Sequence, residues 1–218
     1  MATKTKKKVT EDQIIAGYMD HVLMTEQIPT SIYKFAKELK IEESEFYSFF
    51  GSIEGLQKAI WIKFYENTES VMLKNKEYET FSNKEKMLTF FYSFFELMTL
   101  NRSYVLFALA HDKNMMGAPS QLKDLKKHIV SFAKELIEDG NAEKASRLTQ
   151  HNPKIFSEGA WLQFVFVLKF WMNDNSPGFE KTDMAIEKSI NTIFDVFDNT
   201  PLENIIDFGK FLFKERMA

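Results

Sequence analysis

The chain has 218 residues, 44% of them hydrophobic, and contains no cysteine. This length suits one domain or a small domain fused to a larger one, and the missing cysteines exclude disulfides and thiolate chemistry. Residues 1–8 hold four lysines and no acid, so the rest carries 24 basic against 31 acidic residues, a net charge of −7, which excludes a uniformly basic nucleic-acid-binding protein. The sequence shows neither a signal peptide nor a run of about 18 apolar residues that would span a membrane, so we expect a cytoplasmic location.

Apolar residues recur at spacings of three and four along the chain, which predicts an all-α fold without strands. Thr10 is the expected N-cap of the first helix, because Glu11 and Asp12 in the next turn favour the positive end of the helix dipole. Proline and glycine mark the later boundaries, including Asp139-Gly140. We expect about nine to ten helices, at residues 10–25, 31–39, 43–50, 52–74, 83–100, 102–114, 119–138, 154–173, 179–198 and 202–215.

Residues 31–56, SIYKFAKELKIEESEFYSFFGSIEGL, have the apolar pattern of two short helices joined by a tight turn. Ala36 is central to this pattern, because two helices that cross steeply after a short turn need a small side chain at their contact. The segment therefore predicts a helix-turn-helix. Its expected apolar seam comprises Ile32, Phe35, Ala36 and Leu39 on the first helix, Ile41 in the turn, and Phe46, Phe49 and Phe50 on the second.

This segment resembles the N-terminal domain of the TetR family of bacterial repressors, whose pattern runs approximately T-V-x-x-I-A-x-x-A-G-V-S-x-G-T-L-Y-x-Y-F-x-S-K-x-x-L. The resemblance implies a three-helix helix-turn-helix domain followed by a larger C-terminal helical bundle. We accordingly expect a disordered basic tail at residues 1–8, a DNA-binding-like domain with a connecting fourth helix at residues 9–75, and a ligand-binding and dimerisation domain at residues 76–218. The ungapped match covers Ser31, Ile32, Phe35, Ala36, Ile41, Phe46, Tyr47, Phe49, Phe50, Ser52 and Leu56.

The departures from the family pattern fall on the surface that would approach DNA. Lys40 replaces the turn glycine, Glu42 the serine cap, Glu45 a threonine and Ile53 a lysine, and residues 9–75 carry 6 basic against 11 acidic residues. Carboxylates on this surface oppose binding to phosphate, whereas the lysine tail fits either a DNA-binding arm or a solubilising terminus. The expected DNA contacts are Lys6, Lys7, Lys8, Ser31, Lys34, Lys37, Lys40, Ser44, Tyr47 and Ser48.

The resemblance implies that the C-terminal region binds a small ligand and forms a homodimer through its last two long helices. Residues 87–98, MLTFFYSFFELM, are apolar round more than one helix face, which fits either an apolar ligand pocket or a filled core. The candidate pocket residues are Phe91, Phe94, Phe95, Met98, Tyr104, Phe107, His111, Met115, Phe164, Leu168 and Trp171.

Residues 159–198 contain two apolar stripes separated by a Ser-Pro-Gly turn. Such stripes form a four-helix dimer interface or pack within one chain, and the sequence leaves both open. Asp174 with Asn175 and Ser176 in the turn fits a cation site, although a helix cap is favoured. The candidate interface residues are Trp161, Val165, Met172, Ile186, Ile190, Phe194 and Phe197.

The W-x-x-D-x-S-P-G-F-x-x-T stretch in this region is also similar to the lipid-binding proteins of ubiquinone biosynthesis, which share the TetR-like fold without acting as repressors. That resemblance implies a final amphipathic helix at residues 201–218, which would reach a peripheral membrane surface or pack on its own domain.

Signals of catalysis are poor. The four histidines have no metal-ligand spacing, and no phosphate-binding glycine loop or nucleophile motif is present, so we expect neither an enzyme nor a cofactor. Two hypotheses follow from the sequence. The first is a homodimeric TetR-like transcriptional regulator controlled by a small apolar ligand, and the second is an accessory protein that binds a lipid or isoprenoid, keeps the fold and has lost DNA binding.

Overall fold

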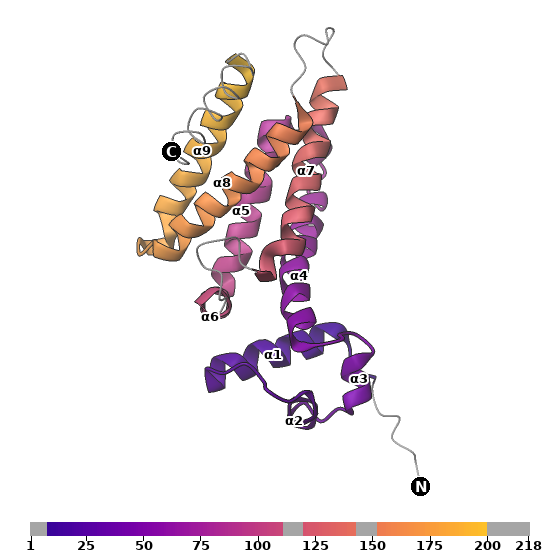
Figure 1. Cartoon of the computed structure of the whole chain (residues 1–218). Coiled ribbons are helices and arrows are strands. Elements are labelled where there is room, and N and C mark those ends of the chain that lie inside the picture. Colours follow the sequence, from indigo (N-terminus) through magenta and orange to yellow (C-terminus); the bar gives the residue numbers. More distant parts are fainter. Residues whose placement is uncertain (1–7, 111–119, 143–151, 200–218) are drawn as a thin grey trace, which may run out of the picture. The chain divides into compact units, whose positions relative to one another are not determined.

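The computed structural model describes residues 8–110, 120–142 and 152–199, and within these ranges it is α-helical with no strand (Figure 1), which confirms the predicted fold class. The helix expected at residues 202–215 lies outside the described residues. The described helices are α1 (Glu11–Thr25), α2 (Ile32–Glu38), α3 (Glu43–Tyr47), α4 (Ile53–Leu73), α5 (Asn83–Leu100), α6 (Arg102–Ala110), α7 (Lys123–Ala142), α8 (Pro153–Asn173) and α9 (Glu180–Asn199), with short 3-10 turns at Tyr78–Thr80, Ser120–Leu122 and Pro177–Phe179.

One predicted boundary is wrong, because α7 does not end at Asp139-Gly140 but continues to Ala142. Inside the helix, Gly140 leaves room for the side chain of Asn83, whose Nδ2 donates a hydrogen bond to the backbone oxygen of Leu136 at 2.7 Å. A Cβ atom on Gly140 would lie 2.5 Å from that nitrogen. The glycine therefore serves close helix packing rather than a turn.

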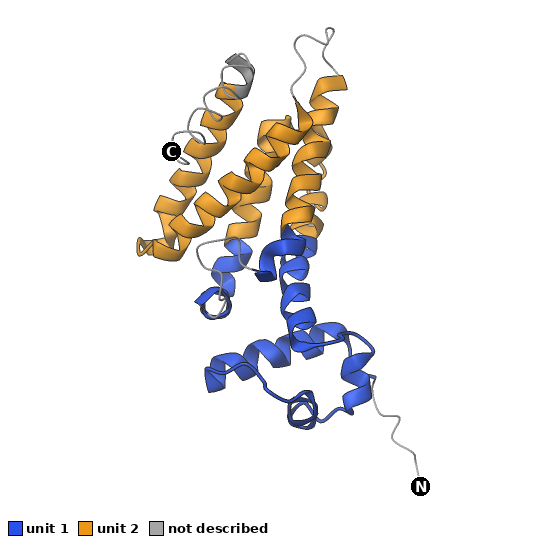
Figure 2. Ribbon diagram, viewed as in Figure 1, with its two compact units in different colours: residues 1–67, 96–125 blue, residues 68–95, 126–218 orange. Residues whose placement is uncertain are grey.

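The helices form two compact units (Figure 2), and the first contains residues 1–67 and 96–125. Within it, α6 packs on α1, and the ring of Tyr104 meets that of Tyr18 edge-on at 6.2 Å. The Tyr18 hydroxyl accepts a 2.7 Å hydrogen bond from Gln57 Nε2 on α4. Helix α6 thus belongs to the same compact unit as the predicted helix-turn-helix, although it lies beyond the boundary expected at residue 75.

The second unit contains residues 68–95 and 126–218, and its described core is aromatic. Helices α8 and α9 lie side by side (Figure 1). Helix α8 also meets α7 through a 2.9 Å ion pair between Lys126 Nζ and Glu158 Oε2. The apolar spacing of α8 explains its position, since its buried residues recur at three and four and face the interior.

Candidate functional surfaces

The helix-turn-helix predicted from residues 31–56 is present in α2, α3 and their turn. Phe35, Ala36 and Phe46 are almost completely buried, and the rings of Phe35 and Phe46 meet edge-on at 6.2 Å. The Ile41 amide donates to the Ala36 oxygen at 3.0 Å, which closes the turn. Phe49 departs from the expected seam, because it is 38% exposed.

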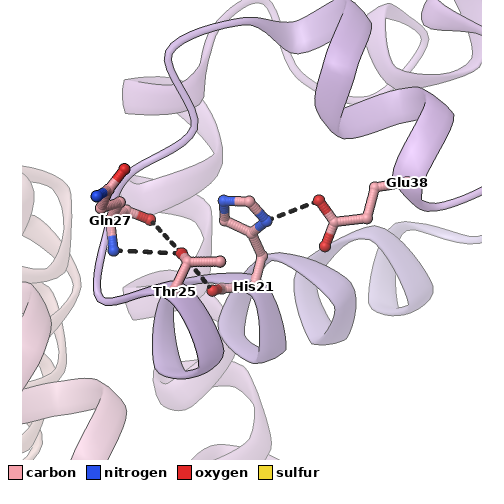
Figure 3. A network of polar contacts seen from close by, with 4 residues as sticks. All are labelled: His21, Thr25, Gln27 and Glu38. Carbon is pink, nitrogen blue, oxygen red and sulfur yellow. Dashed lines mark hydrogen bonds and ion pairs between the residues drawn. The ribbon is translucent and has the colours of Figure 1, made fainter.

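A polar network at the end of α1 positions α2 (Figure 3). His21 Nδ1 lies 2.8 Å from Glu38 Oε2 on α2, and the ring of His21 meets that of Phe35 at 5.8 Å. The Thr25 hydroxyl donates to the backbone oxygen of His21 at 2.7 Å, and the backbone amide of Gln27 donates to the Thr25 hydroxyl oxygen at 3.3 Å. His21 thus connects α1 to the first helix of the helix-turn-helix, and Thr25 closes the end of α1 beside it.

The three glutamates that open α3 each have a neighbour. Glu45 turns back and accepts a 2.8 Å hydrogen bond from the Glu42 amide, which caps the helix. Glu42 pairs with Lys37 at 3.5 Å, and Glu43 accepts a long 3.5 Å contact from the Tyr47 hydroxyl. The acidic residues therefore organise the start of α3, a local role that the charge count alone did not reveal.

The expected DNA contacts occupy different environments. Lys6 and Lys7 lie outside the described residues, and Lys8 is exposed. Ser31 caps α2 by accepting from the Lys34 amide at 3.4 Å. The other expected contacts lie in the helix-turn-helix and are exposed: Lys34, Lys37, Lys40, Ser44, Tyr47 and Ser48.

The backbone of Lys40 is strained, and the hydroxyl of Ser48 is hydrogen-bonded within the helix-turn-helix. Lys40, at the family's glycine position, has a φ of 58°, a left-handed conformation that favours glycine. The Ser48 hydroxyl donates to the Glu45 backbone oxygen at 2.7 Å, so its proton is already used at the end of α3.

Five residues of the predicted ligand pocket form a packed aromatic cluster in the second unit. Phe164 lies at its centre, with ring distances of 6.2 Å to Phe91, 5.3 Å to Phe94 and 5.7 Å to Phe95. Trp171 contacts Phe95 at 6.4 Å, and these five rings are at most 3% exposed. The sequence left open an apolar ligand pocket or a filled core, and the close packing of these rings fits a filled core. Leu168 is also buried, whereas His111 and Met115 lie outside the described residues.

The remaining members of that set, Met98, Tyr104 and Phe107, belong to the first unit. Tyr104 is 1% exposed, and its hydroxyl has no hydrogen-bond partner among the described residues. Burial, with a smaller electrostatic effect of Tyr18, raises the pKa of the Tyr104 hydroxyl above its usual value, so this hydroxyl stays protonated. A buried hydroxyl without a partner is a destabilising feature.

Part of the predicted dimer stripe packs inside the chain, which is one of the two arrangements that the apolar spacing left open. Trp161, Ile186 and Ile190 are at most 5% exposed, and Trp161 stacks on Phe164 at 5.5 Å. Phe194 contacts Phe156 at 5.5 Å, again within one chain. The set also includes the partly buried Val165 and Met172 and, beyond the described side chains, Phe197. Both stripes lie on helices, and their buried members pack within the chain.

The opposite side of the two helices carries the exposed apolar residues. Leu162, Phe166 and Phe170 of α8 are 68%, 56% and 38% exposed, and Met184 of α9 is 49% exposed. A groove of about 870 Å³ runs between the helices, and we call this surface the outer α8–α9 face. The groove is lined by Gly159, Leu162, Gln163, Phe166, Phe170, Lys181, Met184, Ala185, Lys188, Ser189, Thr192 and Ile193. Sequence periodicity missed this face because it favoured the stripe with the more regular apolar spacing.

The turn between these helices is held by Asp174. Its Oδ1 accepts from the Ser176 amide and hydroxyl at 2.8 and 2.7 Å, and its Oδ2 accepts from the Thr182 amide and hydroxyl at 2.9 and 2.7 Å. Burial by itself opposes ionisation of Asp174, but these four bonds outweigh it and hold the pKa well below its usual range. Asp174, Ser176 and Thr182, which stand out in the sequence as D-x-S and T, thus form a cap at the N-terminus of α9.

Among the described residues, no three histidine or acidic side chains are grouped so that they could hold a metal ion. The helices of the described ranges include no apolar segment that could span a membrane.

Comparison with known proteins identifies the family. No curated protein matches the chain. The family model described as the tetracyclin repressor-like C-terminal domain matches residues 86–212, which is more than half of the chain and includes α8 and α9. Together with the helix-turn-helix of α2 and α3, this match shows that the chain belongs to the TetR family.

Proposed function

We propose that this protein is a homodimeric transcriptional regulator that binds operator DNA through α2 and α3 and is controlled by a small apolar ligand in its C-terminal domain. The observation that carries the proposal is the helix-turn-helix, whose buried Phe35 and Phe46 fix α3 while Lys34, Lys40 and Tyr47 stay exposed. Family membership supports a regulator in general.

The charges of the helix-turn-helix are compatible with weak phosphate binding. Glu42 offsets Lys37 through their 3.5 Å ion pair, so Lys37 contributes less positive potential than its position suggests. Lys34 and Lys40 form no ion pair with any described residue. Affinity in this proposal therefore rests on a few cations and on the lysines of residues 1–8.

The test is a salt titration of binding to fluorescent DNA from the region upstream of the protein's own coding sequence, with random duplex as control. Lys34→Ala and Lys40→Ala should each weaken binding and reduce the slope of log affinity against log salt by about 0.9, because one counterion fewer is released. Lys154→Ala removes one positive charge from the exposed start of α8 and is the matched control. Selective binding that depends on Lys34 and Lys40 supports the regulator, whereas no retention of any fragment at low salt contradicts it.

The homodimer is proposed to form through the outer α8–α9 face. Its support is the exposure of Leu162, Phe166 and Phe170, because a monomer rarely leaves large apolar side chains exposed together. Leu162→Asp should therefore shift the protein toward monomer in sedimentation experiments, while Leu23→Asp, on a 42% exposed residue of α1, should not. Equal effects of the two variants would contradict the choice of this face.

A controlling ligand has to enter a cluster that is closely packed in the described structure. Such a ligand would disturb the stacking of Trp161 on Phe164 and the contact of Trp171 with Phe95, so tryptophan fluorescence reports its entry. Titration with saturated fatty acids of increasing length is the first assay. A saturable change that also lowers DNA affinity supports ligand control, and a change without an effect on DNA contradicts that coupling.

A second candidate is favoured by one observation, the net negative charge of the DNA-binding-like domain. Residues 9–75 carry a net charge of −5, which opposes approach to DNA. In this alternative the protein keeps the TetR fold, does not bind DNA and carries a lipid or isoprenoid. Native mass spectrometry of the purified protein distinguishes the two: a co-purified lipid together with no DNA binding favours the carrier.

A further inference from the structure

The outer α8–α9 face contains a hydrogen-bonded polar pair, Gln163 and the partly buried Ser189, within its otherwise largely apolar groove. Gln163 of α8 is only 6% exposed, and its Nε2 donates a 3.0 Å hydrogen bond to the hydroxyl oxygen of Ser189 on α9. The Ser189 hydroxyl in turn donates to the Ile186 oxygen at 3.1 Å. Both residues line the groove, within its length rather than at either end.

The amide of Gln163 retains unused hydrogen-bonding capacity. An amide side chain offers two donors and one carbonyl acceptor, and the bond to Ser189 uses one donor. No other described residue bonds to this amide. Anything that covers the groove must therefore supply polar partners to Gln163, or the remaining groups will be buried unsatisfied.

A second copy of this chain meets that requirement. The face carries both protruding side chains, such as Leu162 and Phe166, and the hollow between its helices, so the same surface provides ridges and a groove. In an interface with twofold symmetry the same patch is used on both subunits, and a residue near its centre meets its own counterpart. A glutamine amide is complementary to itself, because each provides the donor and the acceptor that the other needs.

We propose that Gln163 is the polar centre of a twofold interface between two copies of this chain and pairs there with Gln163 of the partner subunit. This inference rests on the proposed homodimer and assigns its partner recognition. A partner chain with an apolar residue at this position would leave the Gln163 amide buried without a hydrogen-bond partner. The glutamine pair therefore favours association of identical chains, at some cost in the stability of the dimer. The Ser189 hydroxyl fixes the amide orientation.

Charge reversal at the twofold axis tests the proposal. Gln163→Glu and Gln163→Lys should each raise the homodimer dissociation constant by about tenfold or more, because two like charges then face each other. Mixing the two variants, one of them tagged, should restore association through Glu-Lys heterodimers. Gln27→Glu and Gln27→Lys, in the exposed segment after α1, are the matched controls and should mix at random.

The outcomes separate this inference from the proposed dimer. Wild-type protein that stays monomeric in sedimentation contradicts the homodimer itself. A dimeric wild type whose Glu and Lys variants show no preference for each other contradicts only the role of Gln163. If circular dichroism shows that the charged variants do not fold, Gln163→Leu replaces them: its mixed dimers with wild type should be rarer than random pairing predicts, and random pairing overturns the proposal.

Discussion

Replacing Asp174 with asparagine should destabilise the second unit, because the carboxylate accepts four hydrogen bonds that hold the turn between α8 and α9. Asparagine keeps one acceptor oxygen but presents an amide donor to the donors of either Ser176 or Thr182. Two charge-assisted bonds are lost, each contributing about 1.5–3 kcal/mol, so the free energy of unfolding should fall by about 3–6 kcal/mol. That is a large part of the roughly 5–15 kcal/mol that stabilises a typical domain.

The pH dependence of this effect has a defined sign. The folded-state pKa of Asp174 lies below its usual range, so its stabilising effect is present above the unfolded-state pKa of about 4 and is lost as the pH falls toward the folded-state value. The difference in unfolding free energy between wild type and Asp174→Asn should be constant from about pH 5 to pH 8 and shrink below about pH 4.

Urea denaturation followed by circular dichroism measures this difference at each pH. Asp139→Asn, on an exposed residue of α7, is the control and should change stability by less than about 0.5 kcal/mol. A loss below about 1 kcal/mol at pH 7, or a difference that does not shrink in acid, would refute the assignment of Asp174 as the cap of α9.

Other substitutions test single contacts by the same denaturation assay. Tyr18→Phe removes the acceptor of a buried amide and should cost about 1–2 kcal/mol, whereas Tyr104→Phe removes a hydroxyl without a described partner and should be neutral or stabilising; equal losses would contradict both assignments. Lys40→Gly should stabilise by about 1 kcal/mol, because it relieves a left-handed φ of 58°, and a loss of stability would show that this backbone is not strained. Gly140→Ala should destabilise wild type by displacing Asn83 but stabilise Asn83→Ala protein by about 1 kcal/mol; the same sign in both backgrounds would contradict the steric explanation.

The helix-turn-helix was predictable from sequence because its determinants are local. The apolar residues of α2 and its end, Ile32, Phe35, Ala36 and Leu39, recur at helical spacing. Phe35, Ala36 and Phe46 of the predicted seam are buried, whereas Phe49 is exposed. The role of Glu45 was less accessible, because a carboxylate that caps its own helix and one that faces solvent leave the same sequence trace. The charge count therefore identified α3 as acidic but did not show where its carboxylates point.

The C-terminal helices show the opposite balance. Their approximate boundaries and apolar stripes were predicted, but Trp161 and Ile186 proved to face inward, while Phe166 lies on the exposed side. A helix with apolar residues on more than one face does not specify by its own pattern which face meets its neighbour. That choice depends on which side chains fill the interior around Phe164.

The all-α class, most helix positions, most of the helix-turn-helix seam and the family resemblance were predictable from sequence, because each depends on periodicity or on residues close together in the chain. Three contacts were not predictable in this way: Gly140 admits Asn83, His21 meets Glu38, and Asp174 caps α9. These contacts join helices, or cross the turn between two of them, and their geometry is fixed by how the helices pack. Local spacing does not encode that packing, so its consequences for the site became visible only in three dimensions.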